Sequence, residues 1–307
     1  MTRDESMKVA AMIGNLITGS APTVDISPQK VAAARAEFSD EDLREMREIG
    51  LFDGDFLKFY VIRELCARMA LGDVADGLYI LKLFENAAHL DAEQFLSDPY
   101  LHAVHFPECR RGNILLSHAE YAAGEIFQYD EPRFDCELVT PRLGFFDRPV
   151  SFPAVYEGLM PWMSVCPSEM LSMESDIAAA HGRVLVLGLG LGYYPFMIAR
   201  RAEVSEITVV ELNGTIIDLF QEHVFPAFEH KEKIRVVHAD AIAYLEELRG
   251  GEFDFCFADI WEGAVDGAPL YKKILPHEKR LTGTEFAYWL KEPILSYLAD
   301  TEGKSTS

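Results

Sequence analysis

Four continuous apolar runs between residues 184 and 259 dominate the hydrophobic pattern of this chain. Each run is short and is separated from the next by enough residues to form a helix. This pattern favours strands that are buried on both faces of a parallel sheet and joined by crossover helices. The runs are VLVLGLGLG (184–192), ITVVE (207–211), IRVVHAD (234–240) and FDFCFAD (253–259).

These four runs end in residues that suit ligand binding. The first ends in three glycines, the second in Glu211, and the third and fourth in Asp240 and Asp259. In open parallel sheets, ligands bind beside the carboxyl ends of the strands. One ligand-binding crevice therefore accounts for all four endings. The fold class that we predict is α/β, with a Rossmann-like parallel sheet.

The rest of the chain predicts two further segments and a tail. Residues 1–112 carry apolar positions at helical spacing, and Ser39 precedes Asp42 as in a capped helix start, which predicts an α-helical N-terminal module. Residues 113–163 predict a small β-rich bridging region, because short aromatic and β-branched runs alternate with Pro and Gly. The Rossmann-like domain then spans 164–300, and the polar residues 301–307 are expected to be disordered. Strands are expected at 114–121, 125–129, 137–140 and 145–156, and a helix at 171–180.

The charge balance restricts the class of partner. The 50 Asp and Glu residues outnumber the 28 Lys and Arg residues, which gives a formal net charge of −22. A field of this sign opposes the phosphate neutralisation on which nucleic-acid affinity depends. We therefore expect a small-molecule or protein partner rather than DNA or RNA.

Cysteine usage and the start of the chain favour a reducing compartment. The five cysteines are odd in number and form no Cys-x-x-Cys pair, which disfavours a disulfide framework and a structural zinc site. His102, His105 and Cys109 are spaced loosely like metal ligands, but a fourth ligand is absent, so we predict no metal site. Neither a signal peptide nor a run near the ~20 apolar residues of a membrane span is visible. We expect a cytoplasmic protein without a membrane segment.

The glycine triplet predicts a tight turn that a ligand approaches closely. Gly188, Gly190 and Gly192 directly follow the first strand-like run, where a Cβ would obstruct both the turn and the ligand. A dinucleotide loop of the form G-x-G-x-x-G needs Gly or Ala at position 193, which is Tyr193 here. The spacing of the glycines therefore disfavours NAD as the ligand. The alternative is a strand-to-helix turn without a ligand.

Each acid at a strand end has a binding interpretation and a structural one. Glu211 suits the hydroxyls of a ribose, or it is an N-terminal charge on the next helix. Asp240 suits an adenine amine, with the Ala241 amide on a ring nitrogen, or it caps a helix. Asp259 suits a base toward an acceptor, or it is a turn residue.

Taken together, these residues resemble the class I S-adenosylmethionine-dependent methyltransferases over residues 165–262. The resemblance implies that the glycine loop lies against the methionine moiety, Glu211 holds the ribose, Asp240 with Ala241 meets the adenine, and Asp259 faces the reactive centre. S-adenosylmethionine is then the cofactor and methyl transfer the activity. The cofactor-binding set that it implies is Gly188, Leu189, Gly190, Gly192, Tyr193, Glu211, Leu212, Asp240, Ala241 and Asp259, with Asp259 also catalytic.

Departures from the family pattern leave two alternatives open. Many methyltransferases have an acid at the position of Val186, whereas spermidine synthases tend to be apolar there and use an Asp at the end of the fourth strand as their base. That branch, however, usually has an Asp in the glycine loop, where this chain has Leu191, and an Asp-Ser-x-Asp-like turn, where it has Ile-Trp-Glu at 260–262. Aminopropyl transfer is therefore the runner-up. A non-catalytic S-adenosylmethionine-binding module is the third possibility.

Two further expectations concern the surroundings of the crevice. Tyr193, Tyr194, Trp162 and Trp261 either pack on the ligand or fill the core between helix and sheet. Ser164 and Glu169 either touch donor or acceptor, or, for Glu169, supply a first-turn helix acid, which is the reading we favour. Because residues 285–298 look helical, we expect 114–156 to supply the missing edge of the sheet.

Overall fold

The computed structural model describes residues 1–135, 138–158 and 160–304, which fall into two compact units. The first unit contains Met1–Ser97 and Glu120–Ser151, and the second contains Asp98–Ala119 and Phe152–Ser307. These bounds differ from the predicted segments 1–112, 113–163 and 164–300. The β-rich region forms no unit of its own, because Leu138, Leu143 and Phe145 share one apolar core with the N-terminal helices.

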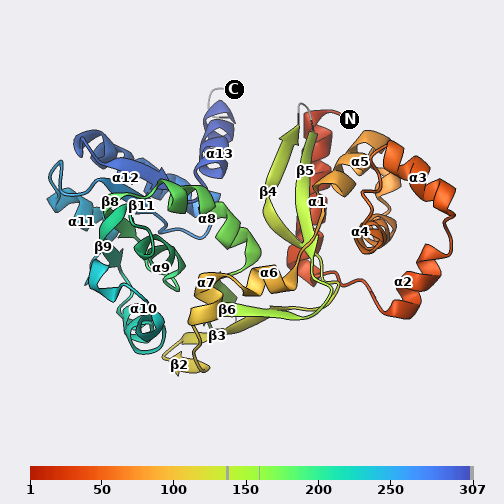
Figure 1. Ribbon diagram of the computed structural model, residues 1–307. Helices are drawn as coiled ribbons and strands as arrows, with labels where there is room; N and C mark the ends of the chain where they lie inside the picture. Colours follow the sequence, from red (N-terminus) through yellow and green to blue (C-terminus); the bar gives the residue numbers. More distant parts are fainter. Residues whose placement is uncertain (136–137, 159, 305–307) are drawn as a thin grey trace. The chain divides into compact units, whose positions relative to one another are not determined.

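The first unit packs helices against a three-stranded sheet (Figure 1). Ser39 caps its third helix, and Asp42 returns the hydrogen bond, as the sequence predicted. The sheet has the order β1 (Ala88–His89), β5 (Leu138–Phe145), β4 (Phe127–Asp135). The strand expected at 137–140 starts outside the described residues, and β5 contains the rest of it. The helices are α1 (Arg3–Ser20), α2 (Pro28–Arg35), α3 (Asp40–Glu48), α4 (Phe56–Arg68), η1 (Leu71–Asp73), α5 (Gly77–Asn86) and α6 (Ala92–Leu96).

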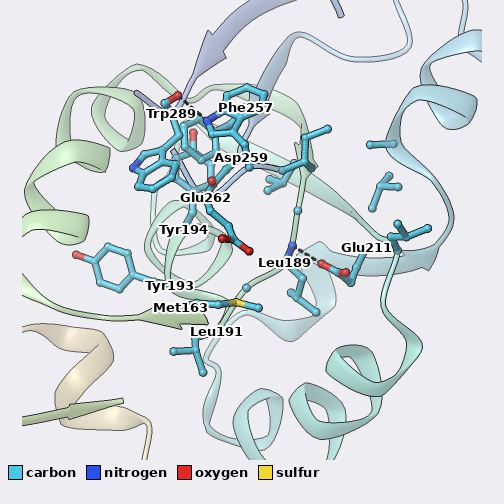
Figure 2. A pocket seen from close by; sticks show the side chains of 18 of the residues that line it. Met163, Leu189, Leu191, Tyr193, Tyr194, Glu211, Phe257, Asp259, Glu262 and Trp289 are labelled. Atoms are coloured by element: carbon cyan, nitrogen blue, oxygen red, sulfur yellow. Dashed lines mark hydrogen bonds between the residues drawn. The ribbon is translucent and has the colours of Figure 1, made fainter. Parts of the chain in front are cut away.

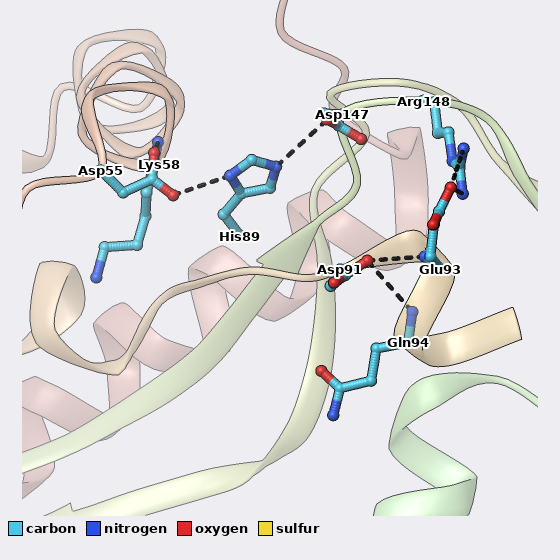
Figure 3. A network of polar contacts seen from close by, with 8 residues as sticks. All are labelled: Asp55, Lys58, His89, Asp91, Glu93, Gln94, Asp147 and Arg148. Carbon is cyan, nitrogen blue, oxygen red and sulfur yellow. Dashed lines mark hydrogen bonds and ion pairs between the residues drawn. The ribbon is translucent and has the colours of Figure 1, made fainter. Parts of the chain in front are cut away.

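A histidine between two aspartates ties together three parts of this unit (Figure 3). His89 Nδ1 lies 2.8 Å from Asp55 Oδ2, and Nε2 lies 3.9 Å from Asp147 Oδ2. The imidazole stacks on Phe145 with the ring centroids 4.8 Å apart. Asp55 also caps α4 by accepting a hydrogen bond from the Lys58 amide. The hydrogen bond with Asp55 raises the pKa of His89 and lowers that of Asp55, so the contact is a charge-assisted one.

The second unit contains a parallel five-stranded sheet with helices on both faces (Figure 1). The four predicted apolar runs form four of its strands, which confirms that part of the prediction. The sheet order is β10 (Ile234–His238), β9 (Val204–Glu211), β8 (Gly182–Leu187), β11 (Phe255–Ala258), β12 (Glu285–Tyr288). Numbered along the chain, this is the order 3-2-1-4-5 of a doubly wound sheet.

The side chains of these strands alternate between two helical layers. Leu185 and Leu187 share a core with α11 (Ala241–Glu247), α12 (Ala264–Arg280) and α13 (Lys291–Lys304). On the opposite face, Phe257 stacks on Tyr194 of α9 (Tyr193–Ala199), with the ring centroids 3.9 Å apart. The remaining elements around this sheet are α8 (Pro167–Ala179), α10 (Gly214–Leu219), η2 (Phe220–Val224), η3 (Phe225–Ala227) and η4 (Lys231–Lys233).

The edge of this sheet corrects a prediction. We expected residues 114–156 to complete it, but β12 does so, pairing in parallel with β11 from Phe255 with Glu285 onward. The segment 285–298, expected to be helical, begins with this strand. The strands of the bridging region instead form β4 and β5 of the first unit and a separate four-stranded sheet. The strand order of this four-stranded sheet is β2 (Cys109–Arg111), β3 (Ile114–Tyr121), β6 (Val150–Glu157), β7 (Met160–Ser164).

The end of the chain also differs from the prediction of a disordered tail at 301–307. Helix α13 continues through residues 301–304, and Thr301 Oγ1 donates to the backbone carbonyls of Tyr297 and Leu298 one turn earlier. Residues 305–307 lie outside the described residues. Within the described part of the chain, no helix combines the length and apolar character that a bilayer span requires.

Candidate functional site

A cavity of about 540 Å³ lies at the carboxyl ends of β8, β9, β10 and β11 (Figure 2). Its lining includes nine of the ten predicted cofactor-binding residues, and the exception is Gly192. Residues from four separate strand ends therefore meet at one pocket, which is the arrangement that a single ligand requires. The nine residues are Gly188, Leu189, Gly190, Tyr193, Glu211, Leu212, Asp240, Ala241 and Asp259.

The glycine loop has a conformation that depends on glycine. Gly188 has φ +97°, and a Cβ there would overlap the backbone carbonyl oxygen of Asp259. Gly190 has φ +54°, and a Cβ there would stand 3.5 Å from Met163 Sδ, an ordinary contact. Gly188 is thus required by the close approach of β8 to the end of β11. Gly190 is required only by its left-handed backbone.

Gly192 has a role in packing rather than at the pocket. It has φ +80°, and a Cβ there would overlap Phe220 and stand 3.0 Å from Phe228 Cζ. The glycine is needed because these two rings press against the start of α9. Unlike the other nine predicted residues, Gly192 does not line the pocket, and cofactor binding by any of the ten stays a prediction.

The Glu211 carboxylate accepts hydrogen bonds that fix the glycine loop. Its Oε2 accepts a hydrogen bond of 3.0 Å from the Leu189 amide (Figure 2). Its Oε1 accepts one of 2.7 Å from the Asn213 amide. Each oxygen of a carboxylate can accept two hydrogen bonds, so both keep capacity for a ligand hydroxyl. Removing this side chain would therefore remove the hydrogen bond that fixes the Leu189 amide of the loop.

Asp240 has the helix-capping role that is one of its two sequence interpretations. It caps α11, since Oδ1 accepts a 2.8 Å hydrogen bond from the Ala243 amide. It is exposed at the rim of the pocket, where Ala241 also lines the wall. Leu212, with 65% of its surface exposed, forms another part of this rim. The helix cap is present, and contact with an adenine stays a prediction.

Asp259 lies at the end of β11 with its carboxylate in the pocket (Figure 2). Burial raises the pKa of its carboxyl to about 7, and the negative charge of Glu211 adds to the shift. No hydrogen bond to this carboxylate comes from the residues that the structure describes. A group with a pKa near neutrality suits proton transfer, because both protonation states are populated at the working pH.

Glu169 is both a first-turn helix acid and part of the pocket lining. It opens α8, as expected for a first-turn acid, but its side chain also lines the pocket. Its Oε1 accepts a 3.1 Å hydrogen bond from Ser164 Oγ. Burial raises its pKa, and the charge of Asp259 raises it further. The first-turn position is confirmed, whereas contact with donor or acceptor stays a prediction. No local signal in the sequence distinguishes a first-turn acid that faces solvent from one that faces a cavity.

Aromatic side chains form much of the remaining wall. Trp162, Trp261 and Trp289 line the pocket together with Tyr194 and Phe257. Trp261 is also held in place, since its Nε1 donates to the Trp289 carbonyl at 3.1 Å. Tyr194 and Trp261 serve core packing and the pocket wall at once. Trp289 was missed, because it follows the unpredicted strand β12.

A tyrosine 91 positions earlier in the chain supports the glycine loop. Tyr100, in α7 (Pro99–Ala103), is fully buried, and its Oη donates a 2.6 Å hydrogen bond to the Leu191 carbonyl. Its ring packs edge-to-face against Tyr193, whose Oη donates to Asp98 Oδ2 at 3.3 Å. The sequence gave no sign of this contact, because long-range pairing leaves no periodic pattern.

The ionisable side chains that line the pocket are all acidic apart from its tyrosines. Six carboxylates line it, whereas no Lys, Arg or His does so among the described residues. This surface disfavours anionic ligands such as a dinucleotide pyrophosphate and favours cationic ones. Across the described residues, no group of three or more His, Cys, Asp and Glu has the geometry of a metal site. The six acids are Glu169, Glu211, Asp240, Asp259, Glu262 and Asp266.

Part of the chain is similar in structure to known proteins. No family model matches the sequence, and no curated protein is significantly similar to it. A solved spermidine synthase in complex with the transition-state analogue AdoDATO aligns with TM-score 0.29 and 13% identity, over 36% of this chain and 44% of that one. The spermidine synthase from Thermotoga maritima aligns with TM-score 0.33 and 12% identity, over 46% and 53%.

A third solved structure belongs to another named activity. Precorrin 8W decarboxylase from Methanobacterium thermoautotrophicum aligns with TM-score 0.30 and 15% identity, over 39% of this chain and 62% of that one. The chain thus spans about half the length of these proteins. Similarity at this level assigns no activity, so a function can be inferred only from the residues of the pocket.

Proposed function

We propose that the pocket binds S-adenosylmethionine and that the protein transfers the methyl group to a small-molecule or protein acceptor. The observation that carries this proposal is the convergence of the glycine loop, Glu211 and Asp259 on one cavity. These groups belong to β8, β9 and β11, so their meeting depends on the sheet order and not on sequence proximity. The volume of about 540 Å³ falls in the range of small-molecule sites.

The residues present fit an adenosyl group. The loop at Gly188 and Gly190 admits a ligand close to the backbone, and Glu211 has acceptor capacity for ribose hydroxyls. Asp240 and the Ala241 amide would take the adenine at the rim of the pocket. Leu189, Tyr193 and Leu212 would supply the apolar contacts. The tenth predicted residue, Gly192, would act only through packing.

The protein's own contribution is positioning and proton transfer. When bound, S-adenosylmethionine supplies an electrophilic methyl group on a positively charged sulfur. Asp259 would accept the proton of an amine or hydroxyl acceptor, since its pKa lies near neutrality. The tryptophan and tyrosine rings would face the cation and exclude water.

A specific observation favours a second candidate, aminopropyl transfer from decarboxylated S-adenosylmethionine. Within the described residues, no cationic side chain lines the pocket that would pair with the carboxylate of the intact donor. A buried carboxylate without a partner costs several kcal/mol. The decarboxylated donor lacks this group. Affinity for the two donors, measured on the same protein, decides between the candidates.

Release of S-adenosylhomocysteine tests methyl transfer against a non-catalytic binding module. The wild-type protein is incubated with S-adenosylmethionine and a broad acceptor panel, and the product is quantified by mass spectrometry. We expect acceptor-dependent release from the wild type and loss of release in Asp259→Asn. Tight donor binding with no release across the panel would support the binding module instead.

A further inference from the structure

The pocket has two halves along the order of the strands. Glu211 and Asp240, which we assign to the donor, lie at the ends of β9 and β10 and define the donor half. Trp261 and Trp289 follow β11 and β12, toward the other edge of the sheet, and define the tryptophan half. Figure 2 shows Trp289 and Glu211 on different sides of the cavity. A molecule bound to Glu211 and Asp240 would therefore leave the tryptophan half to a second ligand.

Both indoles of the tryptophan half are held by hydrogen bonds through their only polar atom. Trp289 Nε1 donates to Ser172 Oγ at 2.8 Å, and Trp261 Nε1 donates to the Trp289 carbonyl at 3.1 Å. An indole has one donor and no acceptor, so each ring keeps only its carbon surface for a ligand. The two tryptophans therefore offer aromatic contact and no polar group.

Ser172 holds Trp289 from outside the pocket lining. It lies on α8, 117 positions before Trp289. Its hydroxyl hydrogen is committed to the Glu169 carbonyl at 2.8 Å, so a lone pair of the oxygen is left for the indole. The backbone of Trp289 is fixed separately, because its amide donates to the Ala258 carbonyl at 3.0 Å. Ser172 thus fixes the ring of Trp289, which the sheet does not fix.

A glycine in α12 makes room for the other tryptophan. Gly267 is buried near the start of this helix, although glycine is a poor helix former. A Cβ at this position would stand 2.9 Å from Trp261 Cγ and 3.0 Å from Ile294 Cδ1, closer than carbon atoms pack. An unfavourable helix residue is therefore present where the Trp261 ring needs the space.

The polar groups beside the two tryptophans are carboxyl groups. Asp259 precedes Trp261 by two residues, and Glu169 lies one helical turn before Ser172; both line the pocket. Within the described part of the chain, the pocket lining has no Lys, Arg or His side chain that would pair with an anion. A ligand in this half is therefore recognised best through a group that donates a hydrogen bond, such as a hydroxyl.

We propose that the tryptophan half is a subsite for a flat aromatic ring that carries a hydroxyl group, and that Ser172 is a positioning residue for this subsite. The ring would pack against Trp261 and Trp289, and its hydroxyl would donate to Asp259 or Glu169. Aromatic pairs attract each other beyond the effect of buried area, so a saturated ring gains less from this wall. That the ring belongs to the acceptor rests on the proposed function above, whereas binding of the ring does not.

The test compares two bicyclic compounds that carry the same hydroxyl group. 2-Naphthol and decahydro-2-naphthol are titrated calorimetrically into the wild-type protein, alone and saturated with S-adenosylhomocysteine. The saturated compound has the larger apolar surface, so hydrophobic burial alone favours it. We expect the wild type to bind 2-naphthol about tenfold more tightly than its saturated counterpart, with and without S-adenosylhomocysteine.

A double-mutant cycle separates a positioning role of Ser172 from a purely structural one. Ser172→Ala and Trp289→Phe each remove the hydrogen bond between α8 and the indole. We expect each variant to reduce the preference for 2-naphthol about fivefold, and we expect Ser172→Ala to have no further effect in the Trp289→Phe background. A residue that only stabilises the fold would leave the preference between the two compounds unchanged.

The control variant is Ser175→Ala, because Ser175 lies on the same helix but is exposed and outside the pocket lining. Its preference for 2-naphthol should equal that of the wild type. Decahydro-2-naphthol binding to the wild type as tightly as 2-naphthol would overturn the aromatic subsite, and this comparison needs no variant. An unchanged preference in Ser172→Ala would overturn the role of Ser172.

Failure of the ring subsite and failure of the donor assignment give different results. Preference for 2-naphthol without any S-adenosylhomocysteine binding would support the ring subsite and contradict the donor assignment. Loss of 2-naphthol binding in the protein saturated with S-adenosylhomocysteine would place both molecules in the donor half, which contradicts the ring subsite and leaves the donor assignment in place.

Discussion

Replacing Asp259 with Asn should stabilise the protein at alkaline pH and remove its turnover. Burial and the charge of Glu211 raise the pKa of Asp259 from 3.8 to about 7. The folded state therefore keeps a proton that the unfolded chain has lost between pH 4 and 7. The stabilising contribution of Asp259 is complete below pH 4 and is lost as pH rises through 7.

The size of the effect follows from the pKa shift. One pKa unit corresponds to about 1.36 kcal/mol, so ionising Asp259 between pH 5 and pH 8.5 costs the folded wild type about 3 kcal/mol. Asn does not ionise and avoids this loss. Urea unfolding at the two pH values should show Asp259→Asn gaining about 3 kcal/mol relative to wild type as pH rises.

Two controls make this prediction decisive. Asp73→Asn, at an exposed aspartate, should show no such pH-dependent gain. Turnover of Asp259→Asn should fall by about 10²–10⁴, the usual contribution of a general base, while donor affinity should fall much less. A stability difference that is equal at both pH values would refute the environment assigned to Asp259. Near-normal turnover would refute its role.

The other predictions concern the glycine loop. Gly188→Ala should lower the free energy of unfolding by about 3 kcal/mol or more, because the new Cβ overlaps backbone at φ +97°. Gly190→Ala, at φ +54° and without such an overlap, should lower it by about 1–2 kcal/mol. Thermal unfolding and donor titration of the two variants measure the difference. Tyr100→Phe should lose about 1–2 kcal/mol with the hydrogen bond to the loop carbonyl, and donor affinity should fall. Tyr79→Phe, at a fully buried hydroxyl without a partner in the described residues, should be neutral or stabilising; equal costs for both tyrosines would contradict this account.

The sheet around the site could be predicted because its strands are buried on both faces. The runs at β8, β9, β10 and β11 are apolar throughout, and the rest of the sequence offers few competing patterns. Strand β12 was missed because its four residues, Glu285–Tyr288, follow a long helix and precede another. A short apolar run of this kind reads equally as strand or helix.

The pocket residues at strand ends could be predicted from the sequence, whereas those on helices could not. Glu211 and Asp259 were found because strand ends fix their place regardless of what surrounds them. Glu169 and Tyr100 depend on which surface their helix turns inward, and tertiary packing decides that. Gly192 differs from the other two glycines, since its spacing matches a ligand loop while the structure shows it packed against Phe220.

The central claim is that the pocket receives the adenosyl group of a sulfonium donor. Calorimetric titration of wild type and Glu211→Ala with S-adenosylmethionine, its decarboxylated form and NAD tests this most directly. We expect a sulfonium donor to bind and NAD not to bind, and we expect Glu211→Ala to weaken donor binding more than tenfold, or about 1.4 kcal/mol. Binding of NAD in preference to both sulfonium donors, or donor affinity unchanged in Glu211→Ala, would contradict it.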